Sequence, residues 1–388
     1  MNIDDRIERR LGFGGDSSVV TDIDAVSPVV HPSDPTGRGP HVERLLDALD
    51  PAFAGSLPPT CYVHGPKGGG KSAVVSALFD RLAEHGGHRR QAIRTTTRAA
   101  DPTLPAFIHV DARTAPTRFR LYHDALAGIR EGPVPDHGVG TDELRTALTD
   151  AVRSAGDAVV AIDHVGEPST PDAATVAEWL ADASSRIVPV CLGRDPPADL
   201  DWEPERTVAF EQYRRHALVE LVTARASEGL AREALTHDQV REIAEWADGD
   251  AHDALAATFG AAVCADRDGS ATVRPGDLDA GIEAVPKPCV ALGRVLALAE
   301  SRRRLLYVLV SLSEDERASV KAATEAVAAD HRVDLSASTV RRVLYELADA
   351  GLLNRVTVEN TAGKGRPPSR LIPRFPTLAF RELFERDR

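Results

Sequence analysis

The residues best suited to chemistry form one glycine-rich run, Gly65-Pro66-Lys67-Gly68-Gly69-Gly70-Lys71-Ser72. The run fits the pattern G-x-x-x-x-G-K-[ST], in which backbone N–H groups surround phosphate oxygens. Lys71 is expected to reach the β- and γ-phosphates and to act in catalysis, and the Ser72 hydroxyl is expected to bind Mg²⁺. We therefore predict that residues 65–73, with Ala73 as the last contact, bind ATP or ADP with Mg²⁺. A glycine-rich turn that matches by chance is the alternative.

Two elements must position this run. Thr60 to His64 has the pattern of a short buried strand, and apolar residues between Val74 and Leu82 recur at helical spacing. The pair Gly86-Gly87 is predicted to end that helix. A strand before the glycines and a helix after them is the context that the motif requires.

A second chemical group is Asp163, which follows the apolar run Ala158–Ile162. P-loop NTPases place at this position a carboxylate that holds Mg²⁺. We predict that Ser72 and Asp163 form the magnesium site, with Asp163 in a catalytic role. The next residue, His164, is a candidate general base, since histidine can serve in that way.

Further strands are predicted around Ala106–Val110, Arg186–Leu192 and Thr207–Phe210, with helices between them. Alternating strands and helices indicate an α/β fold with a parallel sheet and a ligand site at the carboxyl ends of the strands. After Phe210 the apolar spacing becomes helical throughout, which indicates an all-helical domain. We predict four segments: 1–37, a flexible or extended arm; 38–210, the nucleotide-binding base; 211–286, a helical lid; and 287–388, a winged-helix domain.

The C-terminal segment has the pattern of three helices followed by a β-hairpin with a Gly363-Lys364-Gly365-Arg366 tip. This arrangement is typical of a winged helix, whose third helix enters the DNA major groove. Between positions 339 and 374 there are seven Lys and Arg against three Asp and Glu. We predict that double-stranded DNA is bound by Arg341, Arg342, Lys364 and Arg366. A charged face used for protein contacts is the alternative.

Composition limits the class of protein. The formal net charge is -13, yet from position 300 onward Lys and Arg outnumber Asp and Glu by 16 to 13. The acidic, lysine-poor composition is consistent with a high-salt cytoplasm, although GC-rich codon usage also depletes lysine. The four cysteines are widely spaced, which favours buried thiols over zinc ligands or a disulfide framework. With no apolar leader and no membrane-length run, we expect a cytoplasmic protein without a membrane partner.

From about Arg38 to Leu371 the chain resembles the archaeal replication initiators of the origin-recognition and cell-division-control type. The resemblance rests on the glycine-rich run, on Val110-Asp111-Ala112-Arg113, on Phe210-Glu211-Gln212-Tyr213 and on Gly249-Asp250-Ala251. It implies an AAA+ ATPase with a helical lid and a winged helix. It also implies that Tyr213 packs by the adenine, that Arg225 lies near the nucleotide, and that His252 occupies the sensor-2 position. The implied partners are duplex DNA at a replication origin, a replicative helicase and paralogous initiators.

The sequence departs from the family pattern at positions that serve hydrolysis. His164 stands where the family has a glutamate, Arg194 where it has an asparagine, and His252 where it has an arginine. Loss of one preorganised group typically costs about 10²–10³-fold in rate. We therefore expect a nucleotide-dependent switch with weak hydrolysis. The alternatives are an active ATPase that loads a helicase, with His164 or Glu167 as base, and a winged-helix transcription regulator with an NTPase module.

Overall fold

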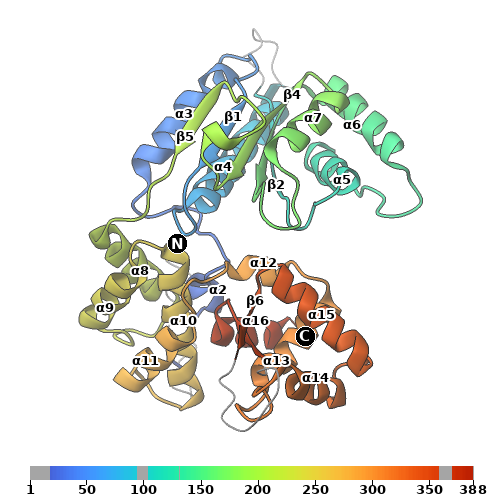
Figure 1. The fold of residues 1–388 in the computed structure, drawn as a ribbon. Helices are drawn as coiled ribbons and strands as arrows, with labels where there is room; N and C mark the ends of the chain where they lie inside the picture. The colour runs from blue at the N-terminus through green and yellow to red at the C-terminus, as the bar shows by residue number, and fades with distance from the viewer. Residues whose placement is uncertain (1–17, 94–103, 131, 358–368, 388) are drawn as a thin grey trace. The chain divides into compact units, whose positions relative to one another are not determined.

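A five-stranded parallel sheet forms the centre of the nucleotide-binding part of the computed structural model, which describes residues 18–93, 104–130, 132–357 and 369–387 (Figure 1). Its strand order is β2-β3-β4-β1-β5. The strands are β1 (Cys61–His64), β2 (Ala106–Asp111), β3 (Ala158–Asp163), β4 (Ile187–Gly193) and β5 (Arg206–Ala209). Each agrees closely with the predicted run. Because all neighbouring strands are parallel, their carboxyl ends meet at one edge of the sheet.

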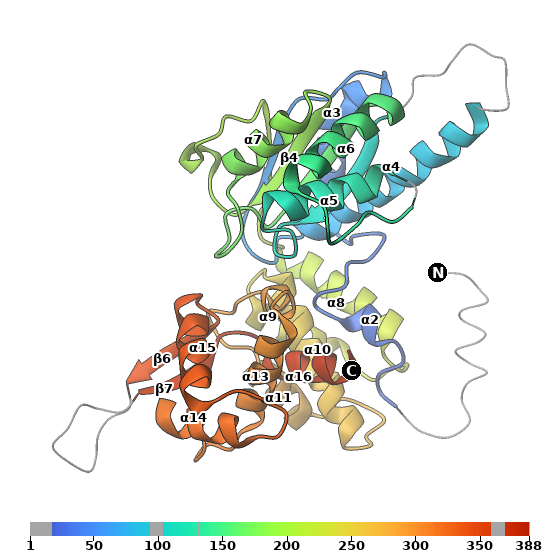
Figure 2. The same ribbon diagram turned by 90° about the vertical axis from the view of Figure 1, so that its right-hand side faces the viewer.

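Helices cover both faces of this sheet (Figures 1 and 2). On one face lie α3 (Gly39–Phe53) and α4 (Lys71–Ile93); on the other lie α5 (Arg118–Ile129), α6 (Thr141–Ala155) and α7 (Ala173–Ala183). The alternation along β3 explains the two layers. Val159 and Ala161 are buried with α3 and α4, whereas Val160 and Ile162 are buried with α5, α6 and α7.

One local expectation differs from the structure in this unit. The helix after the glycine-rich run does not stop at Gly86-Gly87 but continues to Ile93. Glycine inside a helix costs only about 1 kcal/mol relative to alanine, so two glycines weaken a helix without ending it. Helix α5 begins at Arg118 and buries Leu121, Tyr122 and Leu126.

The chain divides into two compact units, one of residues 31–213 and one that joins the N-terminal residues up to Val30 to everything from Arg214 onward. The second unit contains the predicted lid helices α8 (Arg215–Gly229), α9 (His237–Ala247), α10 (Ala251–Arg267) and α11 (Pro275–Glu283). Helix α10 is buried along most of its length and packs on α11, α8 and α9. The predicted lid and winged helix therefore belong to the same unit.

The N-terminal segment from residue 18 is folded rather than a free arm. It includes the short helix α2 (Ile23–Val26), which packs on α8, and an isolated β-bridge between Val20 and Leu230. Val19 and Val26 are fully buried. The close approach explains Gly229, because a Cβ there would lie 2.5 Å from the Asp22 carbonyl oxygen. Residues 1–17 of the predicted arm lie outside the described residues.

The winged-helix pattern is confirmed at the end of the chain. After α12 (Leu292–Leu296) come α13 (Glu300–Ser311), α14 (Val320–Ala329), α15 (Ala337–Asp349), the antiparallel pair β6 (Leu353–Thr357) and β7 (Ser369–Pro373), and α16 (Thr377–Arg386). The Ser336 hydroxyl caps α15 by accepting from the Thr339 N–H. Lys364 and Arg366, at the predicted wing tip, lie outside the described residues.

Within the described ranges, no helix is both long and apolar enough to span a bilayer.

Candidate functional site

The glycine-rich loop lies between the end of β1 and the start of α4. Its backbone has positive φ at Gly65 (144°), Gly68 (69°) and Gly70 (86°). Residues other than glycine rarely adopt these backbone conformations. A Cβ on Gly65 would lie 2.1 Å from the Phe210 carbonyl oxygen, so the end of β5 also requires a glycine there. The loop therefore has the strand–loop–helix geometry that directs backbone N–H groups and a helix N-terminus at one point.

Lys71 is almost fully buried and curls back over the loop. Its Nζ donates to the carbonyl oxygens of Gly65 at 2.6 Å and Pro66 at 2.9 Å. These contacts hold the ammonium group above the loop. A charged amine held there can pair with phosphate oxygens, as the sequence predicts.

Asp163 ends β3 and is 2% exposed. Its Oδ1 accepts the His164 N–H at 2.7 Å, whereas its Oδ2 is buried without a hydrogen-bond partner. Burial by itself raises the pKa of this carboxyl, but His164, His109 and the Ser72 hydroxyl lower it, and the pKa lies well below its usual range. An ionised carboxylate with one oxygen that accepts no hydrogen bond, beside a serine hydroxyl, is a donor set that suits Mg²⁺. The predicted pair Ser72 and Asp163 is thus brought together.

Two histidines flank this carboxylate. His109 on β2 places Nε2 at 3.7 Å from Asp163 Oδ2, and His164 places Nδ1 at 3.3 Å from Asp163 Oδ1. His164 has a positive φ of 64° and its Nε2 lies 4.0 Å from Asp111 Oδ2. Burial lowers the pKa of His164 below its ordinary value, although the nearby carboxylates act to raise that pKa. The ring of His164 is therefore held between two carboxylates, and the contribution of His109 is a feature that the sequence reading missed.

Glu167 is the remaining carboxylate in the loop after β3, and arginines hold it. Arg113 pairs with it bidentately, at 2.7 Å and 2.9 Å, and Arg194 binds the same carboxylate at 2.6 Å. Burial acts to raise the pKa of Glu167, but the two guanidinium groups lower it below its ordinary value. Arg194, in the sensor-1 position, thus contacts a carboxylate. Arg118 and Arg120 also pair with acids, Asp182 and Asp136.

Tyr213 lies beside the glycine-rich loop, in the same unit. A Cβ on Gly70 would be 2.7 Å from its hydroxyl oxygen. The guanidinium of Arg38 stacks over the Tyr213 ring, 3.7 Å from the centroid, and donates to the Glu211 carbonyl oxygen at 2.7 Å. Sequence reasoning named Tyr213 but not Arg38, because no local motif links residues so far apart in the chain.

Arg225 and His252 both lie in the second unit, and each is engaged there. Arg225, 5% exposed, donates to the carbonyl oxygens of Ser27 at 2.8 Å and Val30 at 3.0 Å. His252 Nε2 accepts the Leu292 N–H at 2.9 Å, so its hydrogen is on Nδ1, which donates to Asp253 at 3.0 Å. Their predicted role at the nucleotide stays a prediction.

His252, Asp253 and Cys289 form a buried group whose potential ligand atoms lie within 4.8 Å of one another. A histidine that binds a metal usually donates its second ring N–H to a neighbour. Here the second nitrogen accepts instead, and the Nδ1 hydrogen occupies the position that a metal would need. The group is therefore a hydrogen-bonded connection between α10 and α12.

The predicted DNA-binding helix α15 buries Val340, Leu344 and Leu347 and exposes Arg341 and Arg342. Within the part of the chain that the structure describes, Arg341 has no ion-pair or hydrogen-bond partner among its own neighbours. Glu346 Oε1 binds Arg342 at 2.6 Å and its Oε2 binds Arg302 of α13 at 2.7 Å. One of the two predicted cations on this helix is thus free, and the other is neutralised.

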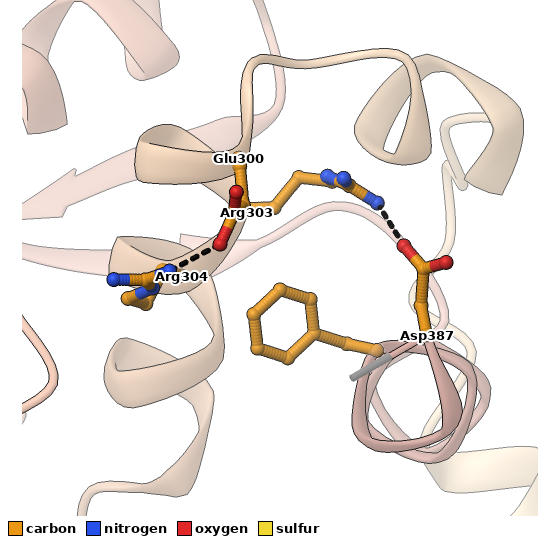
Figure 3. Close-up of a pocket in the computed structure, with 5 residues that line it drawn as sticks. Glu300, Arg303, Arg304 and Asp387 are labelled. Atoms are coloured by element: carbon orange, nitrogen blue, oxygen red, sulfur yellow. Dashed lines mark hydrogen bonds and ion pairs between the residues drawn. The ribbon is translucent and has the colours of Figure 1, made fainter.

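A pocket of about 290 Å³ opens between α13 and α16 (Figure 3). It is lined by Glu300, Arg303, Arg304, Phe384 and Asp387. Figure 3 shows that the charges are internally paired, Arg303 with Asp387 at 2.9 Å and Arg304 with Glu300. The lining carries no net charge.

The sheet order, the glycine-rich loop and the carboxylate at the end of β3 are typical of the P-loop fold of AAA domains. Residues 34–193 match the family described as AAA ATPase domain. The chain is 24% identical to ORC1-type DNA replication protein 5 of Halobacterium salinarum, with 90% of this chain and 87% of that protein covered. It is also 28% identical to ORC1-type DNA replication protein 9 of Haloarcula marismortui, over 40% of this chain and 35% of that protein.

Solved structures agree in fold. The Aeropyrum pernix ORC1 protein in complex with DNA matches with a TM-score of 0.61 and 20% identity, covering 95% of this chain and 97% of that one. The CDC6 protein of Pyrobaculum aerophilum matches with a TM-score of 0.52 and 18% identity, covering 95% and 100%. The resemblance predicted from the sequence is confirmed: the chain is similar over most of its length to an archaeal ORC1-type replication protein, and its fold is that of the archaeal ORC/Cdc6 structures, with an AAA ATPase domain, a helical lid and a winged helix.

Proposed function

We propose that this protein is a DNA replication initiator-like switch that binds ATP or ADP with Mg²⁺, hydrolyses ATP slowly, and binds duplex DNA through its winged helix. One observation carries the proposal. Lys71, Ser72 and Asp163, which we propose bind the nucleotide and its cation, keep polar groups directed at the glycine-rich loop, whereas the nearby carboxylate Glu167 is bound by two arginines.

The residues present fit the implied ligands. Three loop glycines have the backbone that a phosphate cradle needs, and Lys71 supplies a positive charge above them. A buried oxygen without a hydrogen-bond partner, such as Asp163 Oδ2, carries a desolvation cost in free energy. A divalent cation bound to this oxygen would offset that cost, which supports the proposed Mg²⁺ site. When bound, Mg²⁺ would offset phosphate charge, with Ser72 and Asp163 as the residues that hold it.

Slow hydrolysis follows from the positions of the two possible bases. An effective base needs a free lone pair and a pKa near the working pH. Glu167 is buried in a bidentate ion pair, and its pKa is lowered by Arg113 and Arg194. His164 is held between the carboxylates of Asp163 and Asp111. Glu167 is therefore not a free carboxylate, and His164 is not a carboxylate at all, so the loop lacks the usual base.

Duplex binding is supported by the exposed Arg341 and by the positive balance of the C-terminal segment. The Aeropyrum pernix neighbour was solved in complex with DNA. We propose that nucleotide occupancy sets the affinity of this protein for duplex DNA, at a replication origin, alongside paralogous initiators and a replicative helicase.

The deciding experiment measures ATP binding, ATP turnover and duplex affinity on the same purified protein. We expect ATP to bind, with binding lost in Lys71→Ala, and turnover far below 1 s⁻¹, the low end of typical enzymes at about 1–10³ s⁻¹. Turnover at ordinary rates that Lys71→Ala abolishes would favour the helicase-loading ATPase. Genomic binding sites at promoters rather than origins would favour the transcription regulator.

A further inference from the structure

Arg38 is a buried cation beside the glycine-rich loop. It precedes α3, is 4% exposed, and its Nε lies 3.3 Å from the position that a Cβ on Gly70 would take. Its guanidinium is oriented by two contacts, the stack on the Tyr213 ring at 3.7 Å and the hydrogen bond to the Glu211 carbonyl oxygen at 2.7 Å. The packing of residues 38–41 on residues 210–213 therefore fixes a guanidinium against the P-loop.

This charge lacks a counter-charge of its own. Within the described ranges, no carboxylate oxygen lies within ion-pair distance of the Arg38 guanidinium, and its Nε is buried without a hydrogen-bond partner. The carboxylate of Glu211, whose backbone oxygen Arg38 binds, contacts other basic side chains instead, His41 at 3.0 Å and Arg44 at 4.0 Å. Burial of an unpaired charge and an unmade hydrogen bond is unfavourable, and both costs would be offset by an anion bound beside Arg38.

We propose that Arg38 binds the phosphate chain of the nucleotide, with its Nε–H donating to an anionic oxygen beside Gly70. The inference rests on the proposed nucleotide binding and adds to the P-loop a second cation from outside the motif. Arginine suits this role because its planar group can stack on an aromatic ring while its N–H groups bind a phosphate. Tyr213 thus acts as the positioning residue for Arg38.

The test is a titration of the full chain with fluorescent N-methylanthraniloyl-ADP in Mg²⁺, followed by competition with ATP, ADP and adenosine. We expect Arg38→Ala to weaken ADP and ATP by about 10- to 100-fold, the usual size of a hydrogen bond to a charged group. Adenosine, which has no phosphate, should compete equally well with the variant and the original protein. Arg38→Lys keeps the charge, and its affinity for ADP and ATP should lie between those of Arg38→Ala and the original protein.

Arg44→Ala is the matched control, since Arg44 lies in the first turns of α3, the helix that begins directly after Arg38, contacts the same Glu211 and is 45% exposed. It should change ADP affinity by no more than about 2-fold, as expected for an exposed charge. Unchanged ADP affinity in Arg38→Ala, an equal loss for adenosine, or a loss in Arg38→Lys as large as in Arg38→Ala would each overturn the assignment. Loss of binding in Lys71→Ala but not in Arg38→Ala defeats this inference alone. A wild-type protein that binds no nucleotide defeats the proposed function and this inference with it.

Discussion

Glu167 and Arg113 form a bidentate ion pair in which both side chains are less than a tenth exposed, 5% and 8%. The pair joins the loop after β3 to the loop after β2, at the carboxyl edge of the sheet. Arg194, after β4, binds the same carboxylate. The ends of three neighbouring strands are thereby linked through the side chain of Glu167. We infer that this carboxylate stabilises the fold at the edge of the sheet.

Replacing Glu167 tests that role directly. In Glu167→Gln we expect ATP turnover within about 3-fold of the wild-type value, because under our proposal the two arginines keep this side chain from acting as the base. The free energy of unfolding should fall by about 3 kcal/mol, since Arg113 then keeps a buried charge without its partner. Denaturant unfolding and phosphate release are the two measurements. Glu178→Gln, on the exposed face of α7, is the control. A turnover loss above about 100-fold at unchanged stability would identify Glu167 as catalytic.

Removing the magnesium carboxylate should change the metal dependence of nucleotide binding. In Asp163→Asn we expect ATP affinity to be the same with Mg²⁺ and with EDTA, because the unpartnered Oδ2 loses its charge. Fluorescence titration under both conditions measures the effect. Asp157→Asn alters an acid before the amino end of the same strand and should leave the Mg²⁺ dependence intact. Full Mg²⁺ dependence in Asp163→Asn would show that the cation is held elsewhere.

The two arginines predicted to bind DNA on α15 differ in their ion pairing: Arg342 is bound by Glu346, whereas Arg341 is not. Arg341→Ala should weaken duplex binding and reduce the slope of log K against log[salt] by about 1, since one phosphate contact is lost. Glu346→Gln should instead strengthen binding, because it releases Arg342 and Arg302. Both effects are measured by fluorescence anisotropy across a salt series.

Arg232→Ala, at a site 90% exposed in the same unit, controls for net charge. If it weakens duplex binding as much as Arg341→Ala does, the surface is not localised on α15. If Glu346→Gln weakens binding, Arg342 needs its carboxylate in order to be correctly placed.

Arg225 should stabilise the N-terminal segment. Arg225→Met removes hydrogen bonds to the carbonyl oxygens of Ser27 and Val30, and we expect a loss of about 2–3 kcal/mol in unfolding free energy. Amide hydrogen exchange should rise in residues 19–27 before it rises in α10. Arg241→Ala, on the exposed face of α9, should leave both unchanged. Unaltered exchange in residues 19–27 would mean that apolar packing alone holds the segment.

Thiol reactivity should follow burial. Burial raises the pKa of the Cys61 thiol to about 12 and raises that of Cys191 as well, so neither forms a thiolate near neutral pH. Cys289 is also buried and Cys264 is half-buried. With Ellman's reagent we expect at most one rapidly reacting thiol in the native protein and four after denaturation. Rapid reaction of Cys61 in the native state would contradict the buried strand β1.

The sequence predicts best where a motif and its flanking pattern are local. The glycine-rich loop, the five strands and the three-helix winged pattern were all recognisable from spacing, and the structure confirms them. The predicted stop at Gly86-Gly87 was wrong, because a helix tolerates glycine at a modest cost. Nothing local predicted the folding of residues 18–30, which depends on α8, more than 180 residues away.

The candidate site divides in the same way. Lys71, Ser72 and Asp163 were found because each directly adjoins a predicted strand or loop. Arg38, His109 and the partners of Glu167 were missed, since their contacts cross between strands or join distant segments. Arg225 and His252 were assigned from resemblance, and the structure shows them in hydrogen bonds that residue type alone does not reveal.

The isolated bridge between Val20 and Leu230 makes the second unit discontinuous, because the chain enters it, leaves for 183 residues and returns. A fragment that begins at the lid would therefore be incomplete, with Arg225 deprived of its carbonyl acceptors and the surface under Val26 uncovered. A polypeptide designed to fold as this unit must therefore join residues up to Val30 directly to residues from Arg214 onward. Synthesis of the ATPase part is thus finished before its partner unit can close.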